Sequence, residues 1–383
     1  MWPVRRAIIY LGSSLSAWID QKAPRELMDA ACGKQAGHRS GAETPGGVGE
    51  TEILLPGAQE RQRILELGAS VWAFSALAGA LEGGILDELA TPQTPAQISD
   101  RTGASAALIK AVLDVLAALD LVRVAGDAFV CTPGMSAYTS GPRKEIVRAD
   151  LRATQLQAAE LVARFRTGGA SAHGWDYADP ALLEAWGARS TEPVPIWAER
   201  LFPALEGLTD ALEAPTARFL DVGTGVGQLA IAMCRQFPAL RVVGIDPFDT
   251  ALQLARGNVA DAGLGSRIDL RLLPVQDLTD ESCYDLAWVP AMFLPTDVAA
   301  RGLHRVRAAL RPGGWAVVGS LAAEGEGLQP AVLRLMSLLF GSGRLFPHHA
   351  AEMLDTADYE SIRVLPAAPG VPIGMIVARR PAD

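Results

Sequence analysis

Residues 219–228, Phe-Leu-Asp-Val-Gly-Thr-Gly-Val-Gly-Gln, restrict the fold of this chain more than any other segment. They begin with a short apolar run that ends in an aspartate, which is typical of a buried parallel strand. Three glycines then alternate with other residues, and apolar residues 229–234 follow as a buried helix would. A strand, a glycine turn and a helix in this order bring backbone N–H groups close to a bound carboxylate, phosphate or ribose, because glycine has no Cβ. A tight turn without a ligand can also require one or two glycines, so the flanking sequence has to decide.

The flanks of this turn alternate between strand and helix patterns. Short apolar runs predict strands at residues 217–222, 242–246, 267–272, 285–289, 315–319, 359–364 and 374–378. Helical segments separate the first five, which predicts a Rossmann-like α/β domain over residues 216–383. Its seven-stranded sheet should be mostly parallel, with helices on both faces. The last two strands are close in sequence, so they can form an antiparallel edge.

The remaining chain is predicted to form three parts before this domain. Residues 1–57 are rich in glycine and show no apolar periodicity over their second half, so we expect a flexible extension. Residues 58–142 show helix, turn, helix and hairpin patterns in the order of a winged helix, with Thr94 and Pro95 at the start of one helix. Residues 143–215 should form a helical linker and substrate-lid region.

Charge and cysteine usage limit the partners of the chain. The net charge is −9, and residues 58–135 contain five Lys and Arg against nine Asp and Glu. Nucleic acid and anionic membranes are bound by dense positive charge, so the winged helix is expected to mediate dimerisation or cover a substrate. The four cysteines show no paired spacing, which predicts no disulfide framework, no zinc site and a cytoplasmic location. The apolar residues 67–81 are too few to span a membrane and predict a core helix.

The glycine spacing and two later motifs distinguish between cofactors. The turn reads G-x-G-x-G and not the G-x-G-x-x-G of dinucleotide-binding folds. Asp246 ends the second strand, where a carboxylate can accept both hydroxyls of a ribose. Together with Gly-Ile-Asp-Pro at 244–247 and Leu-Arg-Pro-Gly-Gly-Trp at 310–315, the turn resembles that of class I S-adenosylmethionine-dependent methyltransferases. The winged-helix region is similar to the N-terminal module of small-molecule O-methyltransferases and their C-methylating relatives, so the resemblance covers residues 58–380.

The resemblance implies a role for each matching position. The backbone at the glycine turn would hold the methionine part of the cofactor, with Asp221 near its ammonium group. Asp246 would bind the ribose, and Pro247, Gln276 and Asp277 would lie near the adenine. A departure at Leu273 and Pro274, where the family usually has Gly-Asp, leaves the adenine contacts less well supported. The cofactor-binding residues expected in this way are Asp221, Gly223, Thr224, Gly225, Gly227, Asp246, Pro247, Gln276, Asp277, Val289 and Pro290.

A second departure concerns the catalytic base. O-methyltransferases of this type typically carry a histidine after the fourth strand, whereas residues 289–297 read Val-Pro-Ala-Met-Phe-Leu-Pro-Thr-Asp. Met292 and Phe293 in this segment are expected to form walls of the substrate pocket. Large aromatic residues concentrate upstream, and they either fill a domain joint or form a pocket for a cation. Trp175, Tyr177 and Trp197 are the candidates to face the cofactor's sulfonium.

Three hypotheses about function follow from the resemblance. The first is methyl transfer from S-adenosylmethionine to a small molecule of specialised metabolism by a homodimeric enzyme. The second is cyclisation of S-adenosylmethionine to azetidine-2-carboxylate and methylthioadenosine, which an aromatic cage without a base would suit. The third is a non-catalytic regulator that binds the cofactor and uses the winged helix, which its acidic charge disfavours.

Overall fold

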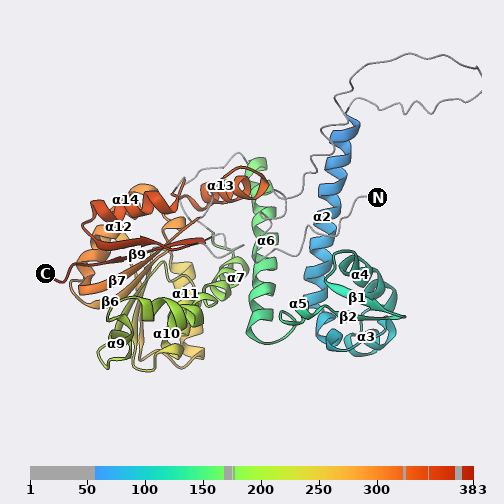
Figure 1. Ribbon diagram of the computed structural model, residues 1–383, viewed down its shortest axis with the longest axis horizontal. Coiled ribbons are helices and arrows are strands. Elements are labelled where there is room, and N and C mark those ends of the chain that lie inside the picture. The colour runs from blue at the N-terminus through green and yellow to red at the C-terminus, as the bar shows by residue number, and fades with distance from the viewer. Residues whose placement is uncertain (1–56, 168–174, 176, 322–324, 344, 367–372) are drawn as a thin grey trace, which may run out of the picture.

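The structure, a computed structural model, describes residues 57–167, 175, 177–321, 325–343, 345–366 and 373–383. The predicted extension therefore lies outside the described residues, except for Gly57. Figure 1 shows an N-terminal helical domain and a C-terminal α/β domain, with the long helix α6 (Gly141–Thr167) between them.

The N-terminal domain has the element order that its sequence predicts. It contains α2 (Ala58–Glu82), η4 (Leu86–Ala90), α3 (Pro95–Thr102), α4 (Ala106–Ala118) and the hairpin β1 (Val122–Ala125) and β2 (Ala128–Cys131). Thr94 caps α3, because its side chain accepts a hydrogen bond from the Gln97 N–H while Gln97 Oε1 accepts one from the Thr94 N–H. Gln93 adds a bridge to Phe129 beside the hairpin. A small apolar core that includes Ile98, Ile109 and Leu113 holds these elements together.

Helix α2 extends beyond that core. Its second half contributes buried residues such as Leu77 and Leu81, as expected of a core helix, but residues 59–72 are exposed. Of the described helices, α2 alone is long and apolar enough to cross a membrane by length and composition. Of its most apolar 18-residue stretch, 28% is buried within the protein. Its exposed half therefore presents apolar side chains to the outside of the chain.

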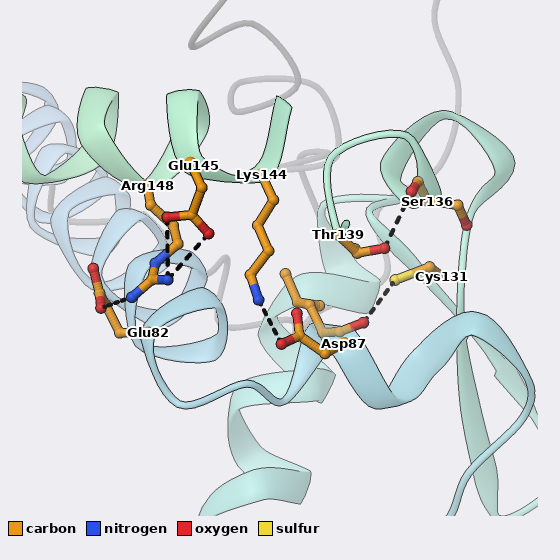
Figure 2. A network of polar contacts seen from close by, with 9 residues as sticks. Glu82, Asp87, Cys131, Ser136, Thr139, Lys144, Glu145 and Arg148 are labelled. Carbon is orange, nitrogen blue, oxygen red and sulfur yellow. Dashed lines mark hydrogen bonds and ion pairs between the residues drawn. The ribbon is translucent and has the colours of Figure 1, made fainter. Parts of the chain in front are cut away.

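Ion pairs attach the start of α6 to the N-terminal domain, as Figure 2 shows. Arg148 donates to Glu82 on α2 at 2.7 Å and lies 3.4 Å from Glu145, and Lys144 is paired with Asp87 on η4. These charges are partly exposed, so each pair contributes about 1 kcal/mol or less to stability. The short α5 (Pro133–Ser136) leads into α6.

The C-terminal domain is a seven-stranded sheet in the order β5-β4-β3-β6-β7-β9-β8, parallel except for β9. This confirms the predicted fold class; the strand nearest the end of the chain, β9, is inserted between β7 and β8. Strands β3 to β9 span Arg218–Val222, Arg241–Asp246, Ile268–Leu272, Tyr284–Val289, Leu310–Leu321, Glu360–Val364 and Ile373–Arg379. The helical elements are α7 (Pro180–Ser190), α8 (Pro193–Ile196), η5 (Trp197–Leu201), η6 (Phe202–Ala204), α9 (Leu208–Glu213), α10 (Gln228–Gln236), α11 (Asp249–Asp261), η7 (Val275–Asp277), η8 (Ala291–Phe293), α12 (Thr296–Ala309), α13 (Leu328–Phe340) and α14 (Pro347–Thr356).

Two apolar clusters cover the two faces of this sheet. One includes Leu303 and Leu354 from α12 and α14, and the other includes Phe202 and Met233 from η6 and α10. The chain leaves β3 toward β4 on one side, and β6 occupies the other side, so the strand order reverses beside β3. In open α/β sheets the crevice at the carboxyl ends of the strands near such a reversal is the usual ligand site.

The Leu-Arg-Pro-Gly-Gly-Trp motif has a structural role in this fold. Arg311 Nη1 donates to both carboxylate oxygens of the buried Asp285, at 2.6 and 2.7 Å, and Asp285 also accepts from the Arg218 N–H. A Cβ at Gly314 would lie 2.9 Å from the Arg311 carbonyl oxygen. The motif therefore holds the starts of β3, β6 and β7 together at the end of the sheet opposite the glycine turn.

Candidate active site

The glycine turn joins β3 to α10 with a backbone that only glycine adopts easily. Gly223, Gly225 and Gly227 have φ of 63°, 56° and 79°, all in the left-handed region. A side chain at any of them would be strained, so the alternating glycines reflect the path of the backbone. Gly227 is the N-cap residue of α10, and a Cβ there would lie 3.3 Å from Ala255 on α11.

Asp221 and Thr224 brace this turn from inside. Thr224 Oγ1 donates to Asp221 Oδ2 at 2.7 Å, and both residues are buried. Burial raises the pKa of Asp221 to about 7, and the charge of Asp246 adds to the increase. A Cβ at Gly244 would lie 2.7 Å from Thr224 Oγ1, so the glycine of the second motif leaves room for this hydroxyl.

Asp246 links the end of β4 to the glycine turn. Its Oδ2 accepts from the Gly225 N–H and its Oδ1 from the Phe248 N–H, each at 2.9 Å. Burial raises the pKa of Asp246, and these two hydrogen bonds oppose the increase. Each carboxylate oxygen keeps a second lone pair, so the two oxygens can still accept a pair of hydroxyl groups.

A cavity of about 330 Å³ opens in front of these residues. It lies at the carboxyl ends of β3, β4 and β6, within the size range of small-molecule sites. The predicted site residues that line it are Trp175, Tyr177, Gly223, Thr224, Gly225, Asp246, Pro247, Gln276, Pro290 and Phe293. Leu183, Phe248 and Leu273 also line it, although nothing in the sequence marks them as site residues. Trp186, one of the large aromatic residues upstream of the α/β domain, lines it as well.

Other predicted site residues lie behind or beside this cavity. Asp221 supports Thr224, Gly227 packs on α11, and Val289 is fully buried in the sheet core. Met292 lines a second, small cavity of about 20 Å³ that shares Trp186 and Phe293 with the first. Asp277, at the end of η7, is not among the residues that line either cavity.

The structure places Trp197 away from both cavities. It is 2% exposed, and its ring lies 5.1 Å from that of Trp288 in the apolar cluster between α10 and the sheet. Its position in η5, beside the buried Phe202, makes it a core residue. Trp197 lines neither cavity, so the structure does not bring it together with the other residues predicted to face the sulfonium.

Trp175 is instead the centre of an aromatic cluster. The ring centroids of Tyr177 and Phe293 lie 4.7 Å from that of Trp175, and those of Trp186 and Phe340 lie 5.4 Å from it. Most of these contacts are edge-to-face, which is a favourable geometry for aromatic rings. Phe340 comes from the end of α13, and no motif in the sequence marks it.

Two guanidinium groups cover parts of this cluster. Arg164 on α6 lies 5.0 Å from the centre of the Tyr177 ring, and Arg189 on α7 lies 4.4 Å from that of Trp186. Arg189 is also paired with Asp150 on α6, whose pKa burial raises to about 6. Tyr177 and Trp186 therefore already have cationic neighbours.

Few titratable side chains reach the two cavities in the part of the chain that the structure describes. They are Asp246 and Tyr177 in the first cavity and Arg189 in the second. His304 is exposed on α12, and His349 Nδ1 accepts a hydrogen bond from the Phe346 N–H at the start of α14. Neither histidine lines a cavity, so neither is placed to act as a base there.

Comparison with known proteins finds a family that matches the centre of the α/β domain. Residues 219–314 match the family described as "Methyltransferase domain". The chain is 41% identical over 71 residues to a release factor glutamine methyltransferase of Cereibacter sphaeroides, a match of 18% of this chain and 26% of that protein. The chain spans less than half the length of the curated relatives that it matches first.

Several solved structures align with this chain over almost their own full length. The S-adenosylmethionine-dependent methyltransferase SibL covers 83% of this chain and 98% of its own, with a TM-score of 0.58 and 20% identity. Human N-acetylserotonin methyltransferase, solved in complex with SAM, covers 84% and 98%, with a TM-score of 0.59 and 18% identity. At these identities the similarity establishes the fold. Residues 219–314 therefore match a methyltransferase domain, and this domain lies behind a helical N-terminal region in a fold that the chain shares with these structures.

Proposed function

We propose that this chain, which carries a class I methyltransferase domain, is an S-adenosylmethionine-dependent enzyme that methylates a small molecule of specialised metabolism. The observation that carries the proposal is the composition of the larger cavity. The glycine turn and Asp246 form one side of it, and the aromatic cluster around Trp175 forms the other. One side suits a nucleoside with a polar tail, and the other suits a cation and an apolar acceptor.

The cofactor fits the polar groups of the cavity. Gly223 and Gly225 present bare backbone to it, and the Asp246 oxygens each have a lone pair left for a ribose hydroxyl. Gln276 Oε1 is buried with no hydrogen-bond partner among the described residues, so it can accept from an adenine amino group. This unsatisfied acceptor supports the adenine contact despite the departure at Leu273 and Pro274.

Positioning and exclusion of water are the contributions that we assign to the protein. Bound S-adenosylmethionine supplies a methyl group on a positively charged sulfonium. Methyl transfer is an in-line displacement, so the walls that align donor and acceptor and keep water out provide much of the rate enhancement. We assign Trp175 and Phe293 to the sulfonium, because Arg164 and Arg189 already lie against Tyr177 and Trp186. Met292 and the second cavity lie on the acceptor side.

The titratable groups of the cavity restrict the acceptor. Of the two titratable side chains that the structure describes in the larger cavity, Asp246 is engaged by two backbone N–H groups and we assign it to the ribose, so it is not free to remove a proton. The other, Tyr177, lies against the Arg164 guanidinium in the aromatic cluster, and we assign it no proton transfer. A base is unnecessary if the nucleophile is a carbon, a neutral amine or an oxygen that is already ionised. We therefore propose an acceptor of one of these kinds, with an apolar body that fits beside Met292 and Phe293.

The aromatic cluster also favours a second candidate function. The rings close around the place assigned to the sulfonium, and S-adenosylmethionine alone can react there. Its amino nitrogen would attack the γ-carbon of the methionine chain, the carbon–sulfur bond would break toward sulfur, and the nitrogen would lose a proton to solvent. The products would be azetidine-2-carboxylate and methylthioadenosine.

One incubation distinguishes these functions. Purified protein is mixed with S-adenosylmethionine, with and without a panel of small-molecule acceptors, and the products are identified by mass spectrometry. S-adenosylhomocysteine that appears only with an acceptor supports methyl transfer, whereas methylthioadenosine formed without one supports cyclisation. Absence of turnover together with tight binding of S-adenosylhomocysteine would instead support a regulator.

We also propose that the protein is a cytoplasmic homodimer that pairs through α2. The first half of this helix exposes Ile64, Leu67, Val71 and Trp72, of which Trp72 is 78% exposed. Their spacing places them along one side of the helix. A contiguous apolar surface of this kind on a soluble domain is typical of a protein interface, and a second copy of the chain would cover both faces at once.

A further inference from the structure

Helix α7 packs on the glycine turn with unusually close contacts. A Cβ at Gly187 would lie 2.2 Å from Val226 Cγ2 and 3.3 Å from the Gln228 side chain, so only glycine allows this approach. One turn earlier, Leu183 packs with Val226 and Ala251 in a small buried cluster. The helix is also well defined at its start, where Asp179 Oδ1 accepts from the N–H groups of residues 181 and 182.

Asn258 on α11 connects the same two elements by hydrogen bonds. Its Nδ2 donates to the Val226 carbonyl oxygen at 3.0 Å and to Glu184 Oε1 at 3.1 Å. A carbonyl and a carboxylate only accept, so both bonds need the amide nitrogen on this side. One side-chain amide thus holds the glycine turn with one hydrogen and α7 with the other.

These contacts join the two sides of the cavity. Val226 lines it from the glycine turn, whereas Leu183, Trp186 and Gly187 line it from α7. Trp186 also lines the second cavity on the acceptor side. A shift of Val226 when the turn takes up a ligand would therefore act on α7 through Gly187 and Asn258.

We propose that Asn258 is a positioning residue that couples the glycine turn to α7, so that cofactor binding at the turn fixes the wall that α7 gives to the acceptor. The proposal rests on the proposed function, because it takes the glycine turn as the cofactor site. In this proposal Gly187 lets α7 pack directly on the glycine turn, because it places no side chain between them.

Hydrogen exchange of the full-length protein with S-adenosylhomocysteine as the probe tests this coupling. In the wild type, the probe should slow amide exchange in residues 180–190. Asn258→Ala should weaken the affinity for the probe, measured by calorimetry, about threefold to tenfold, as expected for the loss of one or two hydrogen bonds. At saturating probe, the slowing over residues 180–190 should fall by at least half. Gly257→Ala is the matched control, because a Cβ at this neighbouring position meets nothing within 4 Å.

An exchange of donor and acceptor separates the two hydrogen bonds. Asn258→Asp with Glu184→Gln can restore the contact to α7, because an amide at 184 can donate to a carboxylate at 258. The carboxylate cannot donate to the Val226 carbonyl. The double variant should therefore regain wild-type exchange at α7 without ligand, yet show less than half of the wild-type response to the probe. A full response in this variant would overturn the proposal.

Substitution of Gly187 provides an independent test of the coupling. Gly187→Ala should weaken the probe's affinity and abolish its effect on α7, and the added change Val226→Ala, which removes Cγ2, should restore part of both. An unchanged α7 response in both Asn258→Ala and Gly187→Ala would refute the coupling. Binding of S-adenosylhomocysteine to the wild type tests the proposed function separately. A wild type that does not bind it would refute the proposed function itself.

Discussion

Asp246 Oδ2 accepts a hydrogen bond from the Gly225 N–H at 2.9 Å, so the end of one strand holds the glycine turn that follows its neighbour. The second oxygen holds the Phe248 N–H at the same distance and thereby orients the chain that enters α11. A single carboxylate thus fixes the backbone at Gly225 and Phe248, two residues that line the larger cavity, whether or not it also binds a ligand.

Replacing this carboxylate should weaken cofactor binding strongly. Asp246→Ala removes both backbone hydrogen bonds and the acceptors that we assign to the ribose. Hydrogen bonds to charged groups are worth about 1.5–3 kcal/mol each, so the dissociation constant for S-adenosylhomocysteine should rise at least tenfold. Isothermal titration calorimetry measures it, with Asp249→Asn on the exposed start of α11 as control. Equal affinities in the two variants would contradict the ribose assignment.

The buried carboxyl of Asp221 should make stability depend on pH. Burial raises its pKa from 3.8 to about 7, so between about pH 4 and pH 7 the folded protein holds a proton that the unfolded chain has lost. The free energy of unfolding should therefore fall as the pH rises through this window, by up to about 4 kcal/mol from this group. Urea unfolding at several pH values should show a smaller decline in Asp221→Asn, whereas Asp261→Asn on the surface should follow the wild type. Identical pH profiles for wild type and Asp221→Asn would show that Asp221 is ionised in the folded protein.

Two tryptophans that look alike in the sequence should respond differently to mutation. Trp175→Leu removes the centre of the aromatic cluster, and we expect turnover of S-adenosylmethionine to fall at least tenfold, with a smaller loss of stability than in Trp197→Leu because Trp175 is less buried. Trp197→Leu removes a core ring and should cost about 3 kcal/mol of stability. Turnover and thermal unfolding of both variants check this. A loss of turnover in Trp197→Leu without a loss of stability would instead indicate that Trp197 acts in the site.

The apolar side of α2 should control the oligomeric state. We expect the wild type to be a dimer by light scattering and Trp72→Glu to be a folded monomer, because a charge in an apolar interface remains unpaired. Gln62→Glu adds the same charge on the polar side of the helix and should leave the dimer intact. A wild-type monomer, or a dimer that tolerates Trp72→Glu, would exclude this interface.

Much of the side of the cavity that we assign to the nucleotide could be predicted from the sequence. Gly223 and Gly225 recur at alternate positions because the turn needs a left-handed backbone there. Such a requirement depends only on the local sequence. Asp246 follows from the end of an apolar strand, since the carboxyl ends of parallel strands share one edge of a sheet. The strands themselves were predictable for the same reason, although the Pro-Gly-Gly motif turned out to lie within β7 and to serve the Arg311–Asp285 pair.

The acceptor side was decided only by tertiary structure. Composition alone does not tell Trp175 from Trp197, because both are large apolar rings beside helical segments. Phe340 reaches the cluster from α13, far along the chain, and Gly187 meets Val226 only because α7 lies across the glycine turn. The sequence by itself determined the fold class and the glycine turn that we assign to the cofactor, since both depend on local backbone requirements and on short-period patterns of apolar residues. Which side chains form the aromatic cluster, and how α7 is tied to the turn, depend on packing between distant segments, and that packing exists only once the chain has folded.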